Sequence, residues 1–372
     1  MVWTMTQAPE AALPNPRFRA GALVAAAFLL TSCDSSDHLA APLTPNVHMD
    51  SVGIPTDGTG EVPSDSVPGT PPIDSTSGTP TDSVSRTPGD TCAAMAQASR
   101  EVSKTGSSAP GIAFGAFDMP PSMMGSKFTG IARASGPYDI LCTLATARRA
   151  GARIIVRMSG GDSYFRNPDR TLNLEKWKAR IDRYKRVNLQ PFIDDGTLIG
   201  HYILDEPHNG NTWKNFVPFE TIEAMARYSK ELWPDLTTVV RAYPDWLSDA
   251  TFHWQYLDAA WAQYSGRKGE VKQWMKDQSA YARTEGFGLI VGLNFLNGGD
   301  ESSGIKGSRD GSYAMSAKQV REWGAVLAAD SHACAFYSWK YTSSYFDRPD
   351  VESALDEVAS KAKNRERQSC KR

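Results

Sequence analysis

The sequence predicts an α/β fold, a TIM-type (β/α)8 barrel in which one strand is weak or irregular, preceded by a disordered N-terminal tether. Beyond residue 111, apolar runs of strand length alternate with helical patterns, as in successive βα units. The run that begins at Leu198 is mostly apolar and ends in Asp205-Glu206-Pro207, which indicates a strand buried on both faces of a parallel sheet. Residues 34–90 contain no Phe, Trp or Tyr and cannot build a core.

Seven strands are clear in the sequence and an eighth is weak. The clear runs are 111–117, 153–156, 198–206, 237–243, 257–264, 289–296 and 335–341, and the weak run is Phe128–Ala132. Helices are expected at 138–149, 174–187, 218–233 and 270–284, then after a capping box at Ser316–Gln319, and finally at 350–361. An open doubly wound sheet is the alternative, but no G-x-G-x-x-G follows the first strand, which disfavours a dinucleotide fold.

The first 105 of the 372 residues are predicted to direct export of the protein and to tether it. Arg17 and Arg19 precede an apolar run, 20–30, that is too short to be a stable membrane span. Leu30-Thr31-Ser32-Cys33 resembles the bacterial lipobox, which implies a signal peptide at 1–32 and a lipid on Cys33; a plain span or an incidental cysteine is the alternative. The protein is then exported and lipid-anchored in the cell envelope, in a leaflet that the sequence does not specify.

The remaining division is a disordered linker at 33–105, a barrel at 106–366 and a C-terminal tail at 367–372. The net charge of -2, without a polybasic block, gives no reason to expect nucleic acid as a partner. In an oxidising compartment Cys92, Cys142, Cys334 and Cys370 allow three pairings. A Cys92–Cys370 bridge would join both ends of the domain, and we interpret Cys142 and Cys334 as buried apolar thiols.

Candidate catalytic groups follow the strands, because the carboxyl ends of barrel strands carry the chemistry. Pro207 ends the fourth strand and leaves Asp205 and Glu206 at that end. Neighbouring strand residues point to opposite faces, so one carboxylate is expected to be chemical and the other structural. Asp118, Asp300 and Glu301 are the candidates for a second reactive carboxylate. We expect Glu206 to face the barrel axis with another carboxyl within about 10 Å.

Substrate contacts are expected from polar and aromatic side chains at other strand ends, although each has a structural alternative. The two arginines could simply neutralise the carboxylates, and the amides could satisfy buried backbone groups. No cofactor or metal site is predicted, because no ligand cluster accompanies His208, which we interpret as a loop residue or a substrate contact. The candidate substrate-binding residues are Arg157, His208, Arg241, Tyr243, Gln263, Asn294, Trp339 and Lys340.

These motifs resemble those of the large clan of retaining glycoside hydrolases with a (β/α)8 barrel. Asp205-Glu206-Pro207 is similar to the Asn-Glu-Pro that ends strand four of the clan, and the resemblance implies that Glu206 is the acid/base. Trp339 matches the tryptophan at the floor of the sugar site. The clan's nucleophile glutamate is absent, since strand seven ends around Asn294. The implied function is a glycoside hydrolase acting on a polysaccharide or oligosaccharide; the alternative is a non-catalytic barrel that binds glycan or another envelope component.

Overall fold

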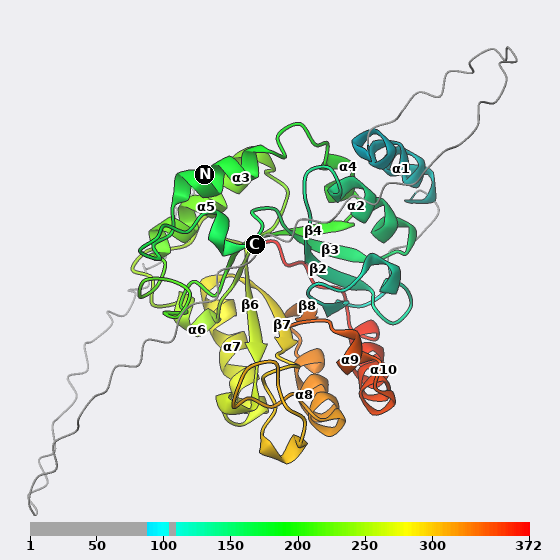
Figure 1. Cartoon of the computed structure of the whole chain (residues 1–372), viewed down its shortest axis with the longest axis vertical. Coiled ribbons are helices and arrows are strands. Elements are labelled where there is room, and N and C mark those ends of the chain that lie inside the picture. Colours follow the sequence, from blue (N-terminus) through cyan, green and yellow to red (C-terminus); the bar gives the residue numbers. More distant parts are fainter. Residues whose placement is uncertain (1–87, 104–108) are drawn as a thin grey trace, which may run out of the picture. The chain divides into compact units, whose positions relative to one another are not determined.

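The computed structural model describes residues 88–103 and 109–372 (Figure 1). The predicted signal peptide, Cys33 and most of the predicted linker lie outside the described residues. Within these residues no helix combines the length and apolar character that crossing a membrane requires.

The described chain forms the predicted barrel of eight parallel strands, in the order β1-β8-β7-β6-β5-β4-β3-β2. A bridge between Phe117 and Ala132, with the Asp118 amide donating to the Ala132 carbonyl at 2.9 Å, links β1 to β2 and nearly closes the ring. The weak run supplies β2, so the carboxylate strand is β4 as predicted. The strands are β1 Ala113–Ala116, β2 Gly130–Ala134, β3 Arg153–Arg157, β4 Leu198–Asp205, β5 Thr238–Arg241, β6 Ala259–Tyr264, β7 Gly288–Leu293 and β8 Ala333–Ser338.

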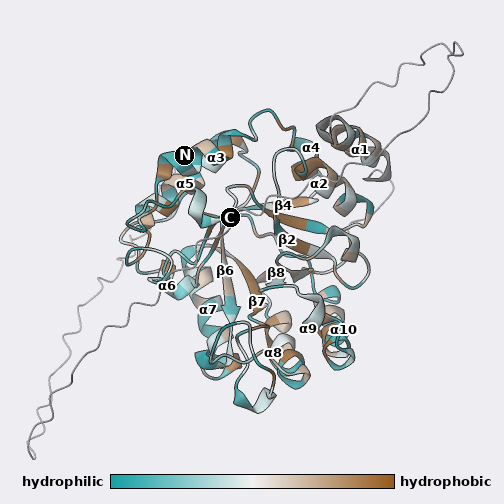
Figure 2. Cartoon of the chain, in the orientation of Figure 1, coloured by the Kyte–Doolittle hydropathy of each residue, from teal (hydrophilic) through white to brown (hydrophobic). Residues whose placement is uncertain are grey.

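Helices surround the strands, and amphipathic patterns place their apolar sides against the sheet. Figure 2 shows the strands mainly in apolar colours, whereas the helices mix hydrophilic and apolar residues. The predicted capping box is confirmed: Ser316 accepts from the Gln319 amide and the Gln319 side chain accepts from the Ser316 amide. The helices are α1 Pro88–Ser103, α2 Ile140–Arg149, α3 Leu174–Asp182, α4 Gln190–Asp194, α5 Phe219–Leu232, α6 Pro244–Leu247, α7 Val271–Glu285, α8 Ala317–Ala329, α9 Ser343–Phe346 and α10 Pro349–Lys363.

The barrel interior is filled with side chains and is not a channel. Tyr202, Trp261 and Tyr337 are fully buried inside it, and the Trp261 indole donates to the Tyr337 carbonyl at 2.8 Å. Small residues permit the closing contact, since a Cβ on Gly115 would lie 1.9 Å from the Gly130 carbonyl oxygen. A ligand therefore has access only at the two ends of the barrel. We call the end formed by the carboxyl ends of the strands the mouth.

The predicted linker boundary is wrong for residues 88–103, which form helix α1 instead of continuing the disordered tether. A disulfide joins Cys92 of α1 to Cys142 of α2. About two turns further along both helices, the Arg148 guanidinium donates to the Ser99 hydroxyl at 3.2 Å. The low aromatic content that suggested disorder does not prevent helix formation here, because α1 is held by a covalent bond and by packing on α2.

The predicted roles of the cysteines are also wrong. Cys334 pairs with Cys370, so Cys142 and Cys334 are not free thiols and Cys92 does not bridge to Cys370. Residues 367–372, the predicted C-terminal tail, cross the amino end of the barrel. There Cys370 packs so closely that a Cβ on Gly288 would lie 2.4 Å from its carbonyl oxygen. The path of this last segment brings Cys370 to the start of β8.

His201, beside the carboxylate motif in sequence, belongs to the core and not to the site. Its ring lies 5.9 Å from that of Trp177, its Nδ1 lies 2.7 Å from the Ser229 hydroxyl, and it has no exposed surface. Burial lowers the pKa of His201 to about 3. The unfolded chain therefore binds a proton near pH 6.5 that the folded protein does not accept.

The free energy of unfolding should consequently fall as the pH drops from about 6.5 toward 3, by up to about 1.4 kcal/mol per pH unit for this one group. Urea denaturation between pH 7 and 5 measures this slope, above the range in which ordinary carboxylates titrate. His201→Gln is expected to flatten it. His253→Gln changes an exposed histidine and is the matched control. An unchanged slope in His201→Gln would contradict the assignment.

Candidate active site

The end of β4 departs from regular strand geometry and brings both carboxylates to the mouth. The pairing of β4 with β5 shifts register between Tyr202 and Leu204, which places Asp205 beside Arg241. Glu206 follows with a left-handed backbone, φ 38°. The expectation that the two neighbours point to opposite faces is therefore wrong. Both carboxylates contact the same guanidinium, that of Arg241.

Five charged groups of alternating sign run across the mouth, and we call them the charge chain. They are Asp162, Arg157, Asp205, Arg241 and Glu206. Arg157 contacts Asp162 through Nη2 and lies with Nη1 3.8 Å from Asp205 Oδ2. Arg241 contacts Asp205 through Nε and reaches Glu206 Oε1 with Nη2 at 3.1 Å. Each arginine thus joins two carboxylates.

The acids of the charge chain differ in their protonation. Burial alone would raise the pKa of Asp205, but Arg241 and Arg157 outweigh it and hold this pKa below its usual value. Burial raises the pKa of Asp162, and Arg157 offsets this effect only in part. Asp205 therefore stays charged and keeps both arginines in place, whereas Asp162 accepts a proton more readily.

Glu206 is the more accessible acid at the end of β4. Its side chain is 31% exposed, compared with 15% for Asp205. Asn209 donates from Nδ2 to Glu206 Oε2 at 2.9 Å, and the Asn209 amide donates to the Glu206 carbonyl at 2.9 Å. One carboxylate oxygen thus faces Arg241 and the other faces Asn209. Glu206 is held in position while part of it remains open to a ligand.

Trp339 lies across the mouth from β4, directly after β8. Its ring stacks on that of Phe117 with centroids 4.8 Å apart, and the Arg241 guanidinium carbon lies 4.5 Å from the Trp339 ring centroid. Gln263 accepts from Arg241 Nη1 at 3.0 Å. Arg241 therefore joins β4, β5, β6 and the aromatic pair, and Glu206 contacts this arginine at the mouth.

Asp118 and Lys340 form an ion pair at another part of the rim. Lys340 Nζ lies 3.7 Å from Asp118 Oδ2, and both side chains are close to half exposed. Asp118 directly follows Phe117, so this pair borders the aromatic stack. Asn294 is engaged in the following loop, where its Oδ1 accepts from the Asn297 amide at 3.3 Å. The carboxyl end of β7 therefore offers an amide where the resembling clan has a nucleophile.

A cavity of about 530 Å³ opens next to His208, two residues after Glu206, and we call it the side cavity. The His208 ring lies 5.2 Å from that of Tyr243, and Lys268 Nζ lies 4.0 Å from the Tyr243 ring centroid. Burial and the nearby charge of Glu206 together raise the pKa of Tyr243 to about 12. Burial lowers the pKa of His208, and the charge of Glu206 opposes this decrease only in part. The side cavity is lined by His208, Tyr243, Asp245, Trp246, Asp249, Lys268 and Tyr281.

The two candidate acids after β7 have local structural roles. Asp300 accepts from the Ser302 amide at 3.0 Å and caps a short 3-10 helix, while the Tyr313 hydroxyl donates to Glu301 at 3.4 Å. Within residues 88–103 and 109–372 neither acid forms a hydrogen bond or an ion pair with Glu206. The loop pairs with itself through the Gly299–Tyr313 bridge, which keeps these carboxylates on the surface.

Several site residues were not anticipated from the sequence. Asp162 follows Arg157 by five positions after two glycines, and Asn209 follows Glu206 by three, a spacing suited to a turn. Trp246 lies in the short helix α6 and Lys268 at the end of a 3-10 turn, and the sequence does not reveal where these short elements lie. No group of His, Cys, Asp and Glu side chains able to hold a metal ion occurs among the residues that the structure describes.

No known protein family and no curated protein sequence matches this chain. Solved structures resemble it at low identity. They include an endo-β-1,4-mannanase from Thermotoga petrophila (13% identity, 70% of this chain and 78% of that chain, TM-score 0.45). They also include an endocellulase from Pyrococcus horikoshii in complex with cellotetraose (8%, 68% and 92%, 0.42) and a GH18 chitinase from Pseudoalteromonas aurantia (10%, 66% and 99%, 0.40). The likeness concerns the overall fold, and the strand order given above establishes the barrel by itself.

Proposed function

We propose that the protein is a glycoside hydrolase with Glu206 as its general acid/base. The observation that carries the proposal is the setting of Glu206. It is a partly exposed carboxylate at the mouth, fixed by Arg241 and Asn209. Arg241 also contacts the ring of Trp339. Sugar rings present apolar C–H faces edged by hydroxyl groups, and an aromatic ring beside charged hydrogen-bonding groups complements both features.

Cleavage requires a second carboxylate that attacks the sugar or activates water. Asp118 is our candidate, because it is exposed at the rim next to the Phe117–Trp339 stack. Around the nearly closed ring β1 is three strands away from β4, so Asp118 and Glu206 come from well-separated parts of the rim. Such an arrangement favours the wider spacing, roughly 6.5–9.5 Å, with which inverting enzymes accommodate a water molecule. The side cavity provides room for a neighbouring sugar unit.

A non-catalytic glycan-binding barrel is the second candidate, and two observations favour it. The carboxyl end of β7 bears Asn294 instead of an acid, and Asp205 is fully engaged by two arginines. In this case Glu206 and Trp339 would contact a sugar without protonating it. Binding without turnover would distinguish this candidate from the enzyme.

The test is a screen of the purified full chain against neutral polysaccharides and aryl glycosides. Release of reducing ends measures turnover, and proton NMR of the first product gives its anomeric configuration. We expect cleavage with inversion. Cleavage with retention would exclude Asp118 as a water-activating base. Saturable binding of a polysaccharide without release of reducing ends would overturn the enzyme and leave the glycan-binding protein.

We also propose that the protein is exported and lipid-anchored through Cys33. Support comes from the lipobox-like sequence and from two disulfides, which persist in oxidising compartments. Cells grown with an alkyne analogue of palmitate should yield labelled protein in the membrane fraction. The Cys33→Ser variant should carry no label and should no longer be found in the membrane fraction. Ser35→Ala, a nearby control, should be labelled and remain in the membrane fraction. Label retained in Cys33→Ser would contradict the proposal.

A further inference from the structure

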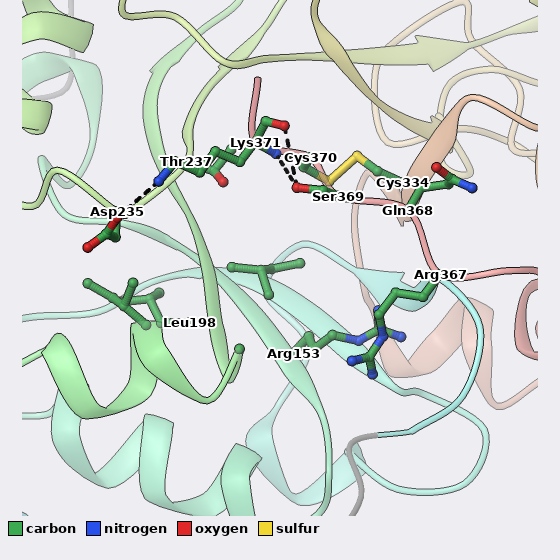
Figure 3. A pocket seen from close by; sticks show the side chains of 13 residues that line it. Arg153, Leu198, Asp235, Thr237, Cys334, Arg367, Gln368, Ser369, Cys370 and Lys371 are labelled. Atoms are coloured by element: carbon green, nitrogen blue, oxygen red, sulfur yellow. Dashed lines mark hydrogen bonds and ion pairs between the residues drawn. A yellow bond between two sulfur atoms is a disulfide. The ribbon is translucent and has the colours of Figure 1, made fainter.

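A second cavity lies at the amino end of the barrel, opposite the mouth, and has a volume of about 360 Å³. It is enclosed by the starts of β3 and β4, by the segment before β5 and by the C-terminal segment that the Cys334–Cys370 disulfide holds (Figure 3). The packed interior of the barrel separates this cavity from Glu206. The residues that line it are Arg153, Ile193, Gly196, Leu198, Ile199, Asp235, Thr237, Cys334, Arg367, Gln368, Ser369, Cys370 and Lys371.

Arg153, the first residue of β3, is a buried cation without a carboxylate partner among the described residues. It is only 4% exposed. Its Nη2 donates to the carbonyl of Gly111 at 2.7 Å and, more weakly, to that of Ala109 at 3.4 Å. Its Nε is buried without a hydrogen-bond acceptor in the part of the chain that the structure describes. Burying an arginine without a compensating anion is unfavourable, and such a group calls for an explanation.

A second guanidinium adds to the positive charge. Figure 3 shows the side chain of Arg367 extending to that of Arg153, and Arg367 Nη2 donates to the same Ala109 carbonyl at 3.0 Å. Burial, together with the nearby charge of Arg367, lowers the pKa of Arg153 to about 10. On the other side of the cavity Lys371 is paired with Asp235 at 3.1 Å. The lining itself therefore holds three cations and one carboxylate.

We propose that this cavity binds a small oxyanion between Arg153 and Arg367. A phosphate, sulfate or carboxylate group fits the chemistry, because a guanidinium presents a planar fork of N–H donors that matches two oxygens. The anion would compensate the buried charge that no described carboxylate neutralises. The cavity volume also accommodates a group attached to the anion, such as glycerol phosphate, so the anion can be free or part of a larger molecule.

The proposal is tested by thermal melting and isothermal titration calorimetry of the full chain with inorganic phosphate, sulfate, acetate or glycerol phosphate. Sodium chloride at equal ionic strength is the reference. We expect a saturable rise in Tm with at least one oxyanion and none with chloride. Tighter binding of glycerol phosphate than of inorganic phosphate would identify an attached group as the ligand, and the reverse order would identify a free anion.

Variants separate this site from a general salt effect. Arg367 is exposed, so Arg367→Gln should keep the fold. It should weaken oxyanion binding by about tenfold or more. Arg153→Met should abolish oxyanion binding. Because it removes an uncompensated charge, its Tm in sodium chloride should be no lower than that of the parent. Lys371→Met is the matched control, because its ammonium already has Asp235 as partner, and it should keep binding. Equal Tm shifts in the parent and in Arg367→Gln, or no saturable shift with any oxyanion, would overturn the proposal.

Discussion

Glu206→Gln is expected to lower turnover by about 10²–10⁴-fold, the usual contribution of a general acid/base, while the protein keeps its fold. Glutamine has the same shape and its carbonyl oxygen can still accept from Arg241, but the amide cannot transfer a proton to the leaving oxygen. Initial rates of reducing-end release on the best polysaccharide of the screen measure the effect. Circular dichroism and Tm should remain close to those of the parent.

Glu301→Gln makes the same chemical change at an acid that the sequence equally suggested. The structure places Glu301 on a surface loop with Tyr313, so this variant should retain parental turnover. Equal losses in the two variants would show that the screen reports on something other than Glu206. Parental turnover in Glu206→Gln would remove the proposed acid/base, and the glycan-binding alternative would then depend on binding measurements alone.

Arg241→Met is expected to cause the largest loss of stability of any single change at the mouth, about 3–5 kcal/mol. Removing this cation leaves Asp205 buried with only the more distant Arg157, and it also removes a partner of Glu206 and Gln263. Urea denaturation of the purified protein gives the free energy of unfolding. The double variant Arg241→Met with Asp205→Leu should regain much of the loss, because it removes the unpaired charge as well.

A surface ion pair provides the comparison for this prediction. Arg321 contacts Glu357 at 2.7 Å with both side chains exposed, so Arg321→Met should cost less than about 1 kcal/mol. A similarly small loss in Arg241→Met would mean that water or a rearranged side chain neutralises Asp205. The charge chain would then not be the element that fixes the mouth.

The barrel could be predicted because its signal is repeated eight times along the chain. Apolar runs of strand length alternate with helical patterns, and even the short run at 128–132 contributes to β2. A repeated pattern tolerates errors of a few residues in each element. The helix predicted to continue to Val187 ends at Asp182, for example, without any consequence for the strand order.

The details of the site depended on features that hydrophobic periodicity does not encode. A register shift in β4 and the left-handed backbone of Glu206 turn Asp205 and Glu206 to the same guanidinium, although an ideal strand would separate them. The sequence placed Glu206 and Trp339 directly after their strands, and the structure has both at these positions. Asp162 was missed because its approach to Arg157 depends on the course of a loop, and loop paths are set by tertiary contacts.

The cysteine pairing failed for a related reason. Sequence separation suggested a bond between the two ends of the domain, whereas each end is bonded to the nearest packed element. For Cys370 this element is the start of β8, which the last segment of the chain meets only because it crosses the amino end of the barrel. Four cysteines permit three pairings, and spatial neighbours decide among them.

The direction of α1 determines at which end of the barrel the described part of the chain begins. Cys92 is bonded to Cys142 near the start of α2, and Ser99 meets Arg148 near its end, so the two helices run parallel. Because α2 leads from the carboxyl end of β2 back to the start of β3, it descends from the mouth, and α1 does the same. Position 88 is therefore level with the opening of the barrel. The arginine-lined cavity lies at the other end of the barrel, away from this first described position.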